Sequence, residues 1–435
     1  MFRPEKRRGI LDVLCNGGQT TYIARGLGRS YGDVAVNPGG GVISTTRLNR
    51  MLSFDDACGV LECEAGVSLA EILDVFVPRG WFLPVTPGTK FVTVGGAIAH
   101  DVHGKNHHVD GSFGQHVLQF TLLTPTGMLL TCSPTENSEV FWATVGGAGL
   151  TGFILTAKIR LIHVTSAYIR VDYRRCENFD AVLAAIRETD ARYKYSVAWV
   201  DCLAKGKSLG RSVLMSGDHI EANALPSSYG DALSIPGKFQ PGVPFDFPGF
   251  VLNPLSIGLF NKVFYAKHRT KEGQVVDYNT YFYPLDAIHH WNRIYGKKGF
   301  TQYQATFPTN ATEGLRSLLE KLSVSGRASF LAVLKRMGQP SQGMLSHPID
   351  GWTLTLDLPI GRGIEGFLHE CDAIVVKNGG RLYMAKDACT RADAFAAMYP
   401  RLKEFQAVKN RLDPDGKLSS RLARRCGIVE GAPEP

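Results

Sequence analysis

The chain has 435 residues, of which 44% are hydrophobic and 20% charged, and its formal net charge is +8. This composition excludes fibrous and intrinsically disordered proteins. The length predicts about two or three domains, because single hydrophobic cores stop growing well below this size.

The first 165 residues alternate between strand-like runs and glycine turns. A helix is predicted over residues 68–80, where apolar residues recur at helical spacing. The strand-like runs are "GGGVIST", "GVLECEAGVS", "FVTVGGAIA", "HVLQFTLLTPTG" and "GLTGFILTAKIRLI". Strands joined by short turns favour an α+β domain over a regular βαβ alternation.

From about Thr165 the pattern changes. Residues 168–206 read as strand, helix and strand. Residues 224–254, rich in proline, glycine and aromatic residues, predict a long loop, and such loops are usually functional or mobile. Alternating strands and helices follow, and the tail is helix-rich and charged. We therefore predict domains at 1–165 and 166–380 and a C-terminal segment, 381–435, that returns to the first.

A glycine-rich stretch, "ARGLGRSYGD" at residues 24–33, raises the question of phosphate binding. The spacing Gly26-x-Gly28-x-x-x-Gly32 does not fit the Rossmann fingerprint, and the proline and glycine that follow forbid a helix. A phosphate loop fails at "HGKN", because Asn106 replaces the required Ser or Thr. In "HDVHGKNHH" the histidines favour a loop lining a cofactor over a metal site, because no acidic residue occurs nearby until Asp110.

Three segments together carry a resemblance: "ARGLGRSYGD", "PVTPGTKFVTVGGAIAHDVHGKNHHVDGSFGQHV" and "TVGGAGLTGFI". They resemble the FAD-binding domain of the p-cresol methylhydroxylase and vanillyl-alcohol oxidase superfamily. Within it, segments such as "GFTQYQ", "GWTLTLDLP" and "GGRLYMAKD" extend a similarity to the decaprenylphosphoryl-β-D-ribose 2′-oxidase family over nearly the whole chain. The resemblance implies a two-domain α+β fold with an antiparallel-sheet substrate domain.

The resemblance also implies an FAD site in which glycine loops close on the pyrophosphate without a helix N-terminus. Glycines let backbone amides approach the oxygens, and hydroxyl groups add donors. Arg29 stands where some relatives carry a histidine bonded covalently to FAD, so we predict noncovalent FAD. Each glycine alone could equally be an ordinary turn residue. The implied contacts are Arg25, Gly26, Gly28, Arg29, Ser30, Tyr31, Gly88, Thr89, Thr93, Gly95, Gly96, His103, Gly104, Asn106, Ser112 and Ile154.

The implied reaction oxidises the C2 hydroxyl of a polyprenylphosphoryl ribose to the 2-keto sugar. A partner NAD(P)H-dependent keto-reductase would complete epimerisation to arabinose. Two alternatives stay open: an FAD-dependent alditol, aldonolactone or other sugar oxidase, and a flavin-free binding protein that keeps the fold.

Lys386, in "YMAKDA", matches a lysine that the family places beside flavin and substrate, where a cation stabilises developing negative charge. Tyr31 and His103 are the other catalytic candidates. Gln302 and Gln304 alternate with Tyr303 and so share one face of a strand, although a solvent-facing sheet would show the same pattern. The remaining substrate-binding candidates are Lys105, Lys335, Tyr383 and Thr355.

Thr355 marks a departure from the family, whose best-studied members carry cysteine at this place in "GWTLTLDLP". A threonine spares the oxidation but removes a nucleophilic thiol. We therefore predict insensitivity to inhibitors that form a thioether here.

The partners that we predict are a lipid-linked phosphopentose, the keto-reductase and the inner membrane surface, without nucleic acid. Scattered cysteines and the lack of a signal-like or membrane-spanning apolar run favour a cytoplasmic protein, peripheral at that membrane, with the side left open. The basic cluster 417–425 reads as a solvated helix face or a lipid contact. In the long loop a polyprenyl tail or the membrane could contact Phe239, Phe245, Phe247, Phe250, Leu252 and Leu255.

Overall fold

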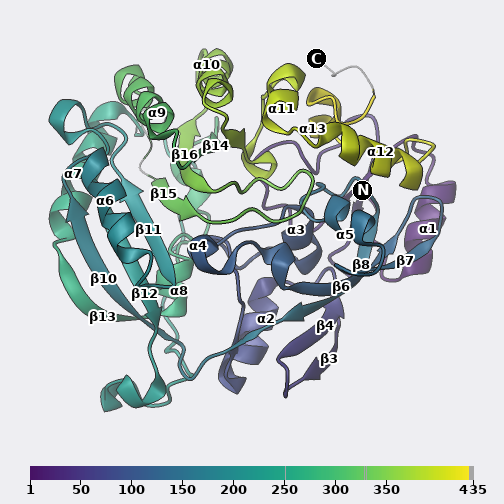
Figure 1. Ribbon diagram of the computed structural model, residues 1–435, viewed down its shortest axis with the longest axis horizontal. Helices are drawn as coiled ribbons and strands as arrows, with labels where there is room; N and C mark the ends of the chain where they lie inside the picture. Colours follow the sequence, from purple (N-terminus) through teal and green to yellow (C-terminus); the bar gives the residue numbers. More distant parts are fainter. Residues whose placement is uncertain (250, 328, 330, 431–435) are drawn as a thin grey trace.

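The computed structural model describes residues 1–249, 251–327, 329 and 331–430 (Figure 1). In the first part of the chain, antiparallel strands form a five-stranded sheet in the order β3-β4-β8-β6-β7. These strands are Met51–Asp55, Val60–Glu64, Phe153–Arg160, Val117–Leu123 and Leu129–Cys132. Two smaller sheets pair β1 (Tyr22–Arg25) with β2 (Gly41–Ser44) in parallel, and β5 (Trp81–Phe82) with β9 (Ile162–His163) antiparallel.

The predicted helix of this part is α2, Leu69–Phe76, continued by the 3₁₀ turn Val77–Arg79. Ser68 caps α2 in a capping box with Glu71, which satisfies backbone donors at both positions. The other helices here are α1 (Arg7–Asn16), α3 (Val94–Ala99), α4 (His107–Asp110), the 3₁₀ turn Phe113–His116 and α5 (Ser138–Thr144).

One expectation for the glycine-rich segments was wrong, because "FVTVGGAIA" is not a strand. Its second half forms α3. The Thr93 hydroxyl accepts the Gly96 N–H at 3.2 Å and so caps the helix. A side-chain cap at the first residue outweighed the β-branched composition and the two glycines.

The second part of the chain forms an eight-stranded antiparallel sheet in the order β13-β10-β12-β11-β15-β16-β14-β17. Its strands are Lys271–Asp277, Tyr168–Cys176, Ser212–His219, Tyr195–Val200, Ala332–Met337, Gly351–Pro359, Phe300–Pro308 and Arg381–Leu382. The predicted strand-helix-strand of residues 168–206 is confirmed as β10, α6 and β11.

Helices cover one face of this sheet: α6 (Phe179–Thr189), α9 (Thr312–Ser325) and α10 (Ile364–Lys377) (Figure 1). Their apolar sides join the main core with residues such as Leu318, Leu354 and Phe307. The opposite face meets α4 and α8 (Tyr278–Phe282). Helix α4, from the first part of the chain, thus lies against the face that α6, α9 and α10 leave open.

The predicted long loop is confirmed, since residues 225–249 and 251–253 contain only the 3₁₀ turn Ser227–Tyr229. It follows the 3₁₀ turn Ala222–Ala224 and leads into α7, Pro254–Lys267, which the sequence analysis did not predict. The remaining 3₁₀ turns are Gly206–Ser208 and Trp291–Tyr295.

The tail is helix-rich, as predicted: the 3₁₀ turn η7 (Met384–Lys386), α11 (Ala392–Met398), α12 (Leu402–Leu412) and α13 (Arg421–Arg425). It runs back beside the N-terminal elements (Figure 1). Tyr22 donates its backbone N–H to the Lys417 carbonyl at 2.6 Å and accepts from Ser419 at 3.0 Å. The tail therefore lies alongside β1.

The chain is a mixed α+β protein with antiparallel main sheets, as predicted. None of the helices in the described residues combines the length and apolarity needed to cross a bilayer.

Candidate functional site

The open face of the eight-stranded sheet carries polar side chains over its strands β14, β15 and β16. The register places Gln302 opposite Asp357, Gln304 opposite Thr355 and Thr306 opposite Thr353. On β15, Val333 faces Thr355 and Lys335 faces Thr353. Side chains directly opposite one another lie on the same face. These eight side chains therefore form one patch, which we call the site face.

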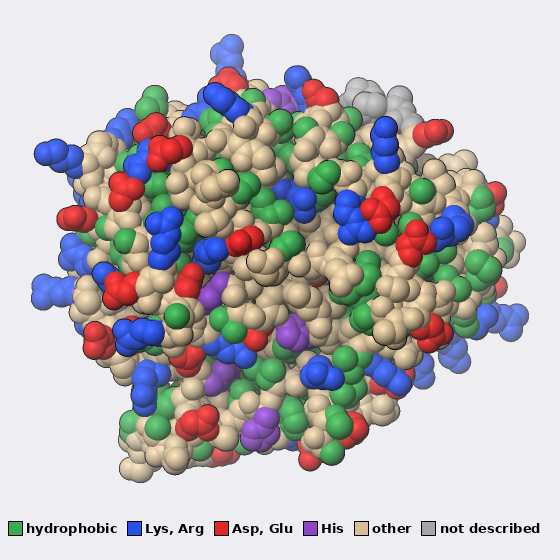
Figure 2. Space-filling view, in the orientation of Figure 1, with side chains coloured by type: hydrophobic (Ala, Val, Ile, Leu, Met, Phe, Trp, Pro, Cys, Tyr) green, Lys and Arg blue, Asp and Glu red, His purple; other side chains and the backbone are tan. Residues whose placement is uncertain are grey.

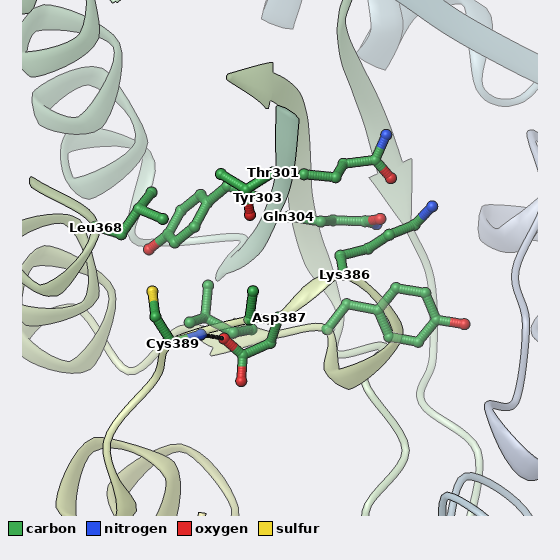
Figure 3. A pocket seen from close by; sticks show the side chains of 11 residues that line it. Thr301, Tyr303, Gln304, Leu368, Lys386, Asp387 and Cys389 are labelled. Atoms are coloured by element: carbon green, nitrogen blue, oxygen red, sulfur yellow. Dashed lines mark hydrogen bonds between the residues drawn. The ribbon is translucent and has the colours of Figure 1, made fainter. Parts of the chain in front are cut away.

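The alternation predicted for residues 302–304 is confirmed. The Tyr303 hydroxyl points to the other side and donates to Asp372 of α10 at 3.0 Å. Gln304 points away from it, together with Lys386 (Figure 3). The Gln304 amide donates to the Thr353 hydroxyl at 3.0 Å and contacts His103 Nε2 at 2.8 Å.

The histidine loop, residues 100–108, lies against the site face. Lys105 accepts the Ser196 N–H through its carbonyl at 2.9 Å, and its ammonium donates to the Tyr281 carbonyl. That ammonium also lies 4.0 Å from the centroid of the Tyr281 ring. The His103 ring packs 5.1 Å from the Tyr383 ring, whose hydroxyl donates to the His100 carbonyl at 3.0 Å.

Lys386 reaches the site from η7, beside the loop that carries Tyr31. Its ammonium lies 3.9 Å from the centroid of the Tyr31 ring, a cation–π distance. The Tyr31 N–H donates to the Ala385 carbonyl at 2.8 Å, which holds the two loops together. A cavity beside Lys386 is lined by both faces of β14 and by the 387–389 turn, where Asp387 accepts the Cys389 N–H (Figure 3).

Three lysines in this region carry lowered pKa values. Burial lowers the pKa of Lys386 to about 7, against an opposing effect of Asp357 and with further lowering by Lys335. Burial likewise lowers the pKa of Lys105 to about 7 and that of Lys335 to about 8. Such a cluster favours an anionic ligand, because a bound negative charge offsets the cost of burying the ammonium groups.

Asp357 was missed by the sequence analysis although it belongs to the same patch. Its carboxylate accepts from the Gln302 amide and, at 3.4 Å, from the Tyr295 hydroxyl. Burial raises its pKa to about 6, and Gln302 and Lys386 oppose that rise. The signal was available, because Thr353, Thr355 and Asp357 alternate through an otherwise apolar strand.

His347 was also missed. Its Nε2 lies 2.9 Å from the Thr306 hydroxyl, and its ring packs 4.8 Å from that of Tyr383. Burial keeps the pKa of His347 and of His103 well below the usual value, so both imidazoles are neutral at pH 7. No local pattern in the sequence marked His347.

The glycine loops predicted to hold FAD meet at α3. A β-carbon on Gly26 would lie 2.2 Å from the Thr93 hydroxyl, so this loop closes on the cap of α3. Gly28 has a φ of +65°, which favours glycine. At Gly88 a β-carbon would meet no atom within 4 Å, and at Gly96 it would meet only the Thr93 hydroxyl. The backbone at Gly88 and Gly96 is therefore not covered by other parts of the protein, as the close approach of a bound pyrophosphate requires.

Buried polar atoms around these loops also fit a cofactor. His100 Nδ1, His103 Nδ1 and Ser112 Oγ are buried without a hydrogen-bond partner. Buried donors and acceptors are normally satisfied, so their clustering indicates a polar ligand. The residues present therefore fit FAD.

The other predicted cofactor residues occupy the same loops or their supports. Asn106 donates to the Pro84 carbonyl at 2.7 Å, and Gly95 donates its N–H to Ala65 at 2.8 Å. At Gly104 a β-carbon would lie 2.8 Å from the Thr86 carbonyl. Ile154 is buried on β8. Arg25, at the end of β1, and the loop residues Ser30 and Thr89 are half-buried.

Arg29 is not brought to the site face. It is exposed, and its guanidinium lies 5.7 Å over the Phe91 ring. The remaining catalytic and substrate-binding candidates are brought together: Tyr31, His103, Lys105, Gln302, Gln304, Lys335, Thr355, Tyr383 and Lys386.

Comparisons with known proteins agree with this arrangement. Residues 10–133 match a family model described as an FAD binding domain, and residues 314–426 match one described as D-arabinono-1,4-lactone oxidase. The first match confirms the FAD cofactor, and the two together confirm an FAD-dependent oxidoreductase.

The chain is 42% identical to decaprenylphosphoryl-β-D-ribose oxidase of Mycolicibacterium smegmatis, over 97% of this chain and 92% of that protein. It is 34% identical to a Streptomyces coelicolor protein described by its place in the mprA 5′ region, over 83% of this chain and 100% of the relative. L-gulonolactone oxidase of Bos taurus is 26% identical to the chain, over 95% of this chain and 92% of that protein. The chain therefore belongs to the decaprenylphosphoryl-β-D-ribose oxidase family of FAD-dependent oxidoreductases.

Proposed function

We propose that this protein oxidises the C2 hydroxyl of a polyprenylphosphoryl ribose to the 2-keto sugar. The observation that carries the proposal is the site face itself: two strand amides, Gln302 and Gln304, lie among three lysines beside the glycine loops. Amides suit sugar hydroxyls, and buried ammonium groups suit a phosphodiester. The name of the mycobacterial relative, which spans nearly the whole chain, supports the same substrate class.

Bound FAD supplies the hydride acceptor for such an oxidation. The chain's own residues hold the sugar. As the hydride leaves C2, the hydroxyl would release its proton to water. Lys386 places positive charge beside that oxygen, and Tyr31 fixes the direction of the ammonium. His103 and Tyr383 close one side of the site, and Gln302 and Gln304 bind hydroxyl groups.

The phosphodiester would lie toward Lys105 and Lys335, and Thr355 would line the path between them and the amides. For the cofactor, the residues that we assign are Arg25, Gly26, Gly28, Arg29, Ser30, Tyr31, Gly88, Thr89, Thr93, Gly95, Gly96, His103, Gly104, Asn106, Ser112 and Ile154. Since Arg29 cannot form the covalent histidine link, FAD should dissociate on acid extraction. We retain the proposed division at residues 165 and 380, with an FAD-binding domain and a substrate domain.

Gly88→Ala tests the cradle separately from the chemistry. A methyl group there meets no protein atom, so we expect the melting temperature of the flavin-free protein to stay unchanged. It would collide with a bound pyrophosphate, at a cost of about 1–3 kcal/mol, and weaken FAD binding roughly tenfold. Fluorescence titration of FAD measures this. Gly366→Ala, exposed on α10, is the control; equal affinity in wild type and Gly88→Ala would remove Gly88 from the site.

A second candidate is the oxidation of an aldonolactone or alditol. It is favoured by the lactone-oxidase model over residues 314–426 and by the relative that oxidises L-gulonolactone. Anaerobic mixing of the flavin-loaded protein with each substrate separates the two. We expect polyprenylphosphoryl ribose to bleach the flavin and alditols or lactones to leave it oxidised. The reverse result would establish the second candidate.

The product chemistry implies a partner. A 2-keto sugar must be reduced from the opposite face to become arabinose, so an NAD(P)H-dependent keto-reductase would complete the epimerisation. The lipid chain of the substrate would keep both reactions at the inner membrane surface, where this chain would be a peripheral cytoplasmic protein.

Exposed apolar side chains on α7 supply a surface for that contact. Leu255, Leu259 and Val263 follow one stripe of the helix and are 85%, 65% and 57% exposed. Asn261 points inward and donates to Asp201 at 2.7 Å. Phe264 packs against Trp199 with ring centroids 4.5 Å apart, and Trp199 lies across β15 from Thr355. Helix α7 therefore packs beside the site face and keeps the stripe on its exposed side.

The long loop adds Phe239 and Phe245, exposed by 92% and 61%. Phe247 and Leu252 are half-buried, and Phe250 lies outside the described residues. Lys262 and Lys267 on α7 are exposed too, so the apolar stripe has a basic rim suited to anionic lipid. Lysine and arginine side chains are numerous along the edge of the molecule that carries α7 and β10 (Figure 2).

Leu259→Glu combined with Val263→Glu should abolish this contact. We expect binding to vesicles containing phosphatidylglycerol to fall about tenfold or more in sedimentation, because carboxylates oppose both insertion and the anionic surface. The matched control is Val324→Glu on α9, where the valine is 76% exposed and no basic rim is proposed. Equal losses for both variants would reject α7 as the membrane contact.

A further inference from the structure

The geometry of Lys386 depends on a contact between two loops that are far apart in sequence. Tyr31 donates its N–H to the Ala385 carbonyl, one residue before Lys386. Next to it, a β-carbon on Gly32 would lie 1.6 Å from the Asp387 carbonyl oxygen, so the backbones touch where only glycine fits. The distance between the Lys386 ammonium and the Tyr31 ring is set by this seam.

Arg425, from α13, bridges the two sides of the seam. Its Nε and Nη2 donate to the Asp33 carboxylate at 3.1 and 2.8 Å. Its Nη1 donates to Asp387 Oδ2 at 3.0 Å and to the Thr390 carbonyl at 2.5 Å. Asp33 lies two residues after Tyr31, and Asp387 directly follows Lys386. One guanidinium therefore joins the two loops whose side chains form the cation–π pair.

The bridge is largely shielded from water. The side chains of Arg425, Asp33 and Asp387 are 16%, 14% and 7% exposed. Asp387 Oδ1 also accepts the N–H groups of Cys389 and Thr390, which fixes the turn after Lys386. Without the guanidinium, Asp33 and Asp387 would lose the cation that they share, and Arg421 would remain only 3.9 Å from Asp33. The repulsion between the two partly buried carboxylates would then open the seam.

We propose that Arg425 is a positioning residue that holds Lys386 against Tyr31. The proposal rests on the proposed function only in assigning Lys386 to the reaction. At Arg425 alone it replaces the two readings of the basic cluster 417–425, because this side chain is held in the shielded bridge, whereas Arg421 is 47% exposed. A bidentate fork suits this task, because it fixes both distance and orientation, which an ammonium cannot do.

The test compares Arg425→Met and Arg425→Lys with Arg421→Met as matched control. Arg421 lies on the same helix, is 47% exposed and approaches Asp33 only to 3.9 Å. The first readout is hydrogen exchange of the full chain without flavin, followed at the peptide that contains the Tyr31 amide. We expect faster exchange there for both Arg425 variants, with the core strands of the eight-stranded sheet unchanged, and no effect of Arg421→Met.

The second readout is steady-state kinetics of the flavin-loaded protein. We expect Arg425→Met to lower kcat about tenfold or more, with KM and FAD affinity little changed, because misplacing a catalytic group affects the reacting step. Arg425→Lys, which keeps the charge but loses the fork, should fall between wild type and Arg425→Met.

The proposal would be overturned if the exchange rate at the Tyr31 amide stayed at the wild-type value in the Arg425 variants, or if exchange rose equally throughout the chain. A kcat equal to wild type in Arg425→Met would also overturn it. The exchange measurement uses no substrate. If the substrate assignment were wrong, the faster exchange at the Tyr31 amide would still be confined to the Arg425 variants. The kinetics would then show no turnover of polyprenylphosphoryl ribose by any of the proteins, wild type included.

Discussion

Lys386→Met is expected to bind FAD and yet lose substrate-dependent flavin bleaching. The ammonium lies against the Tyr31 ring beside Gln304, and no other lysine is placed at this ring among the described residues. Removing one group that stabilises developing charge in a preorganised site costs about 10²–10³ in rate. We expect a loss of at least that size in the rate of anaerobic flavin reduction.

The fold should tolerate this change. Burial lowers the pKa of Lys386 to about 7, so the folded chain holds this proton less tightly than the unfolded chain. At neutral pH the charged lysine therefore costs stability, and Lys386→Met should keep or raise the melting temperature of the flavin-free protein. Lys377→Met, exposed on α10, controls for loss of a lysine. Undiminished bleaching in Lys386→Met would remove this residue from the reaction.

Thr355→Cys is expected to convert an unreactive position into one that is labelled by thiol-trapping inhibitors. Thr355 is half-buried on the site face between Gln304 and Val333, so a thiol there would meet a molecule bound at the site. The nearby lysines favour the thiolate, which is the reacting form. Wild-type protein should carry no adduct on the peptide that contains position 355, and the variant should be fully modified.

Peptide mass spectrometry measures this adduct, and bound substrate should slow its formation. Thr312→Cys, at the start of α9, gives a control thiol away from the site that substrate does not protect. If Thr355→Cys stayed unmodified while Thr312→Cys reacted, position 355 would not face the inhibitor.

The structural features that depend on a local sequence pattern could be predicted from the sequence. Alternation in "TQYQ" predicted which side chains share a face of β14, and the capped apolar run at residues 68–80 predicted α2. Lys335 was found because a charge at the end of an apolar strand is conspicuous, which is a short-range signal. Lys386 was found through the resemblance of its motif to a known family, not from the chain alone.

The errors arose where distant partners decide the outcome. Helix α3 depends on one capping hydroxyl, that of Thr93. Helix α7 has apolar side chains on several sides, so its sequence shows no helical periodicity of apolar residues. Arg425 looked like a surface charge because its carboxylate partners, Asp33 and Asp387, lie elsewhere in the chain. Asp357 was overlooked because its role appears only when β14 pairs with β16.

Position-specific deuterium in the substrate tests the central claim most directly. Flavin-loaded protein is mixed anaerobically with polyprenylphosphoryl ribose carrying deuterium at C2 or at C3, and the decay of oxidised flavin absorbance is followed. The account predicts several-fold slower bleaching with deuterium at C2 alone, with a 2-keto lipid as product. Bleaching slowed by deuterium at C3, or no bleaching with either lipid, would contradict it.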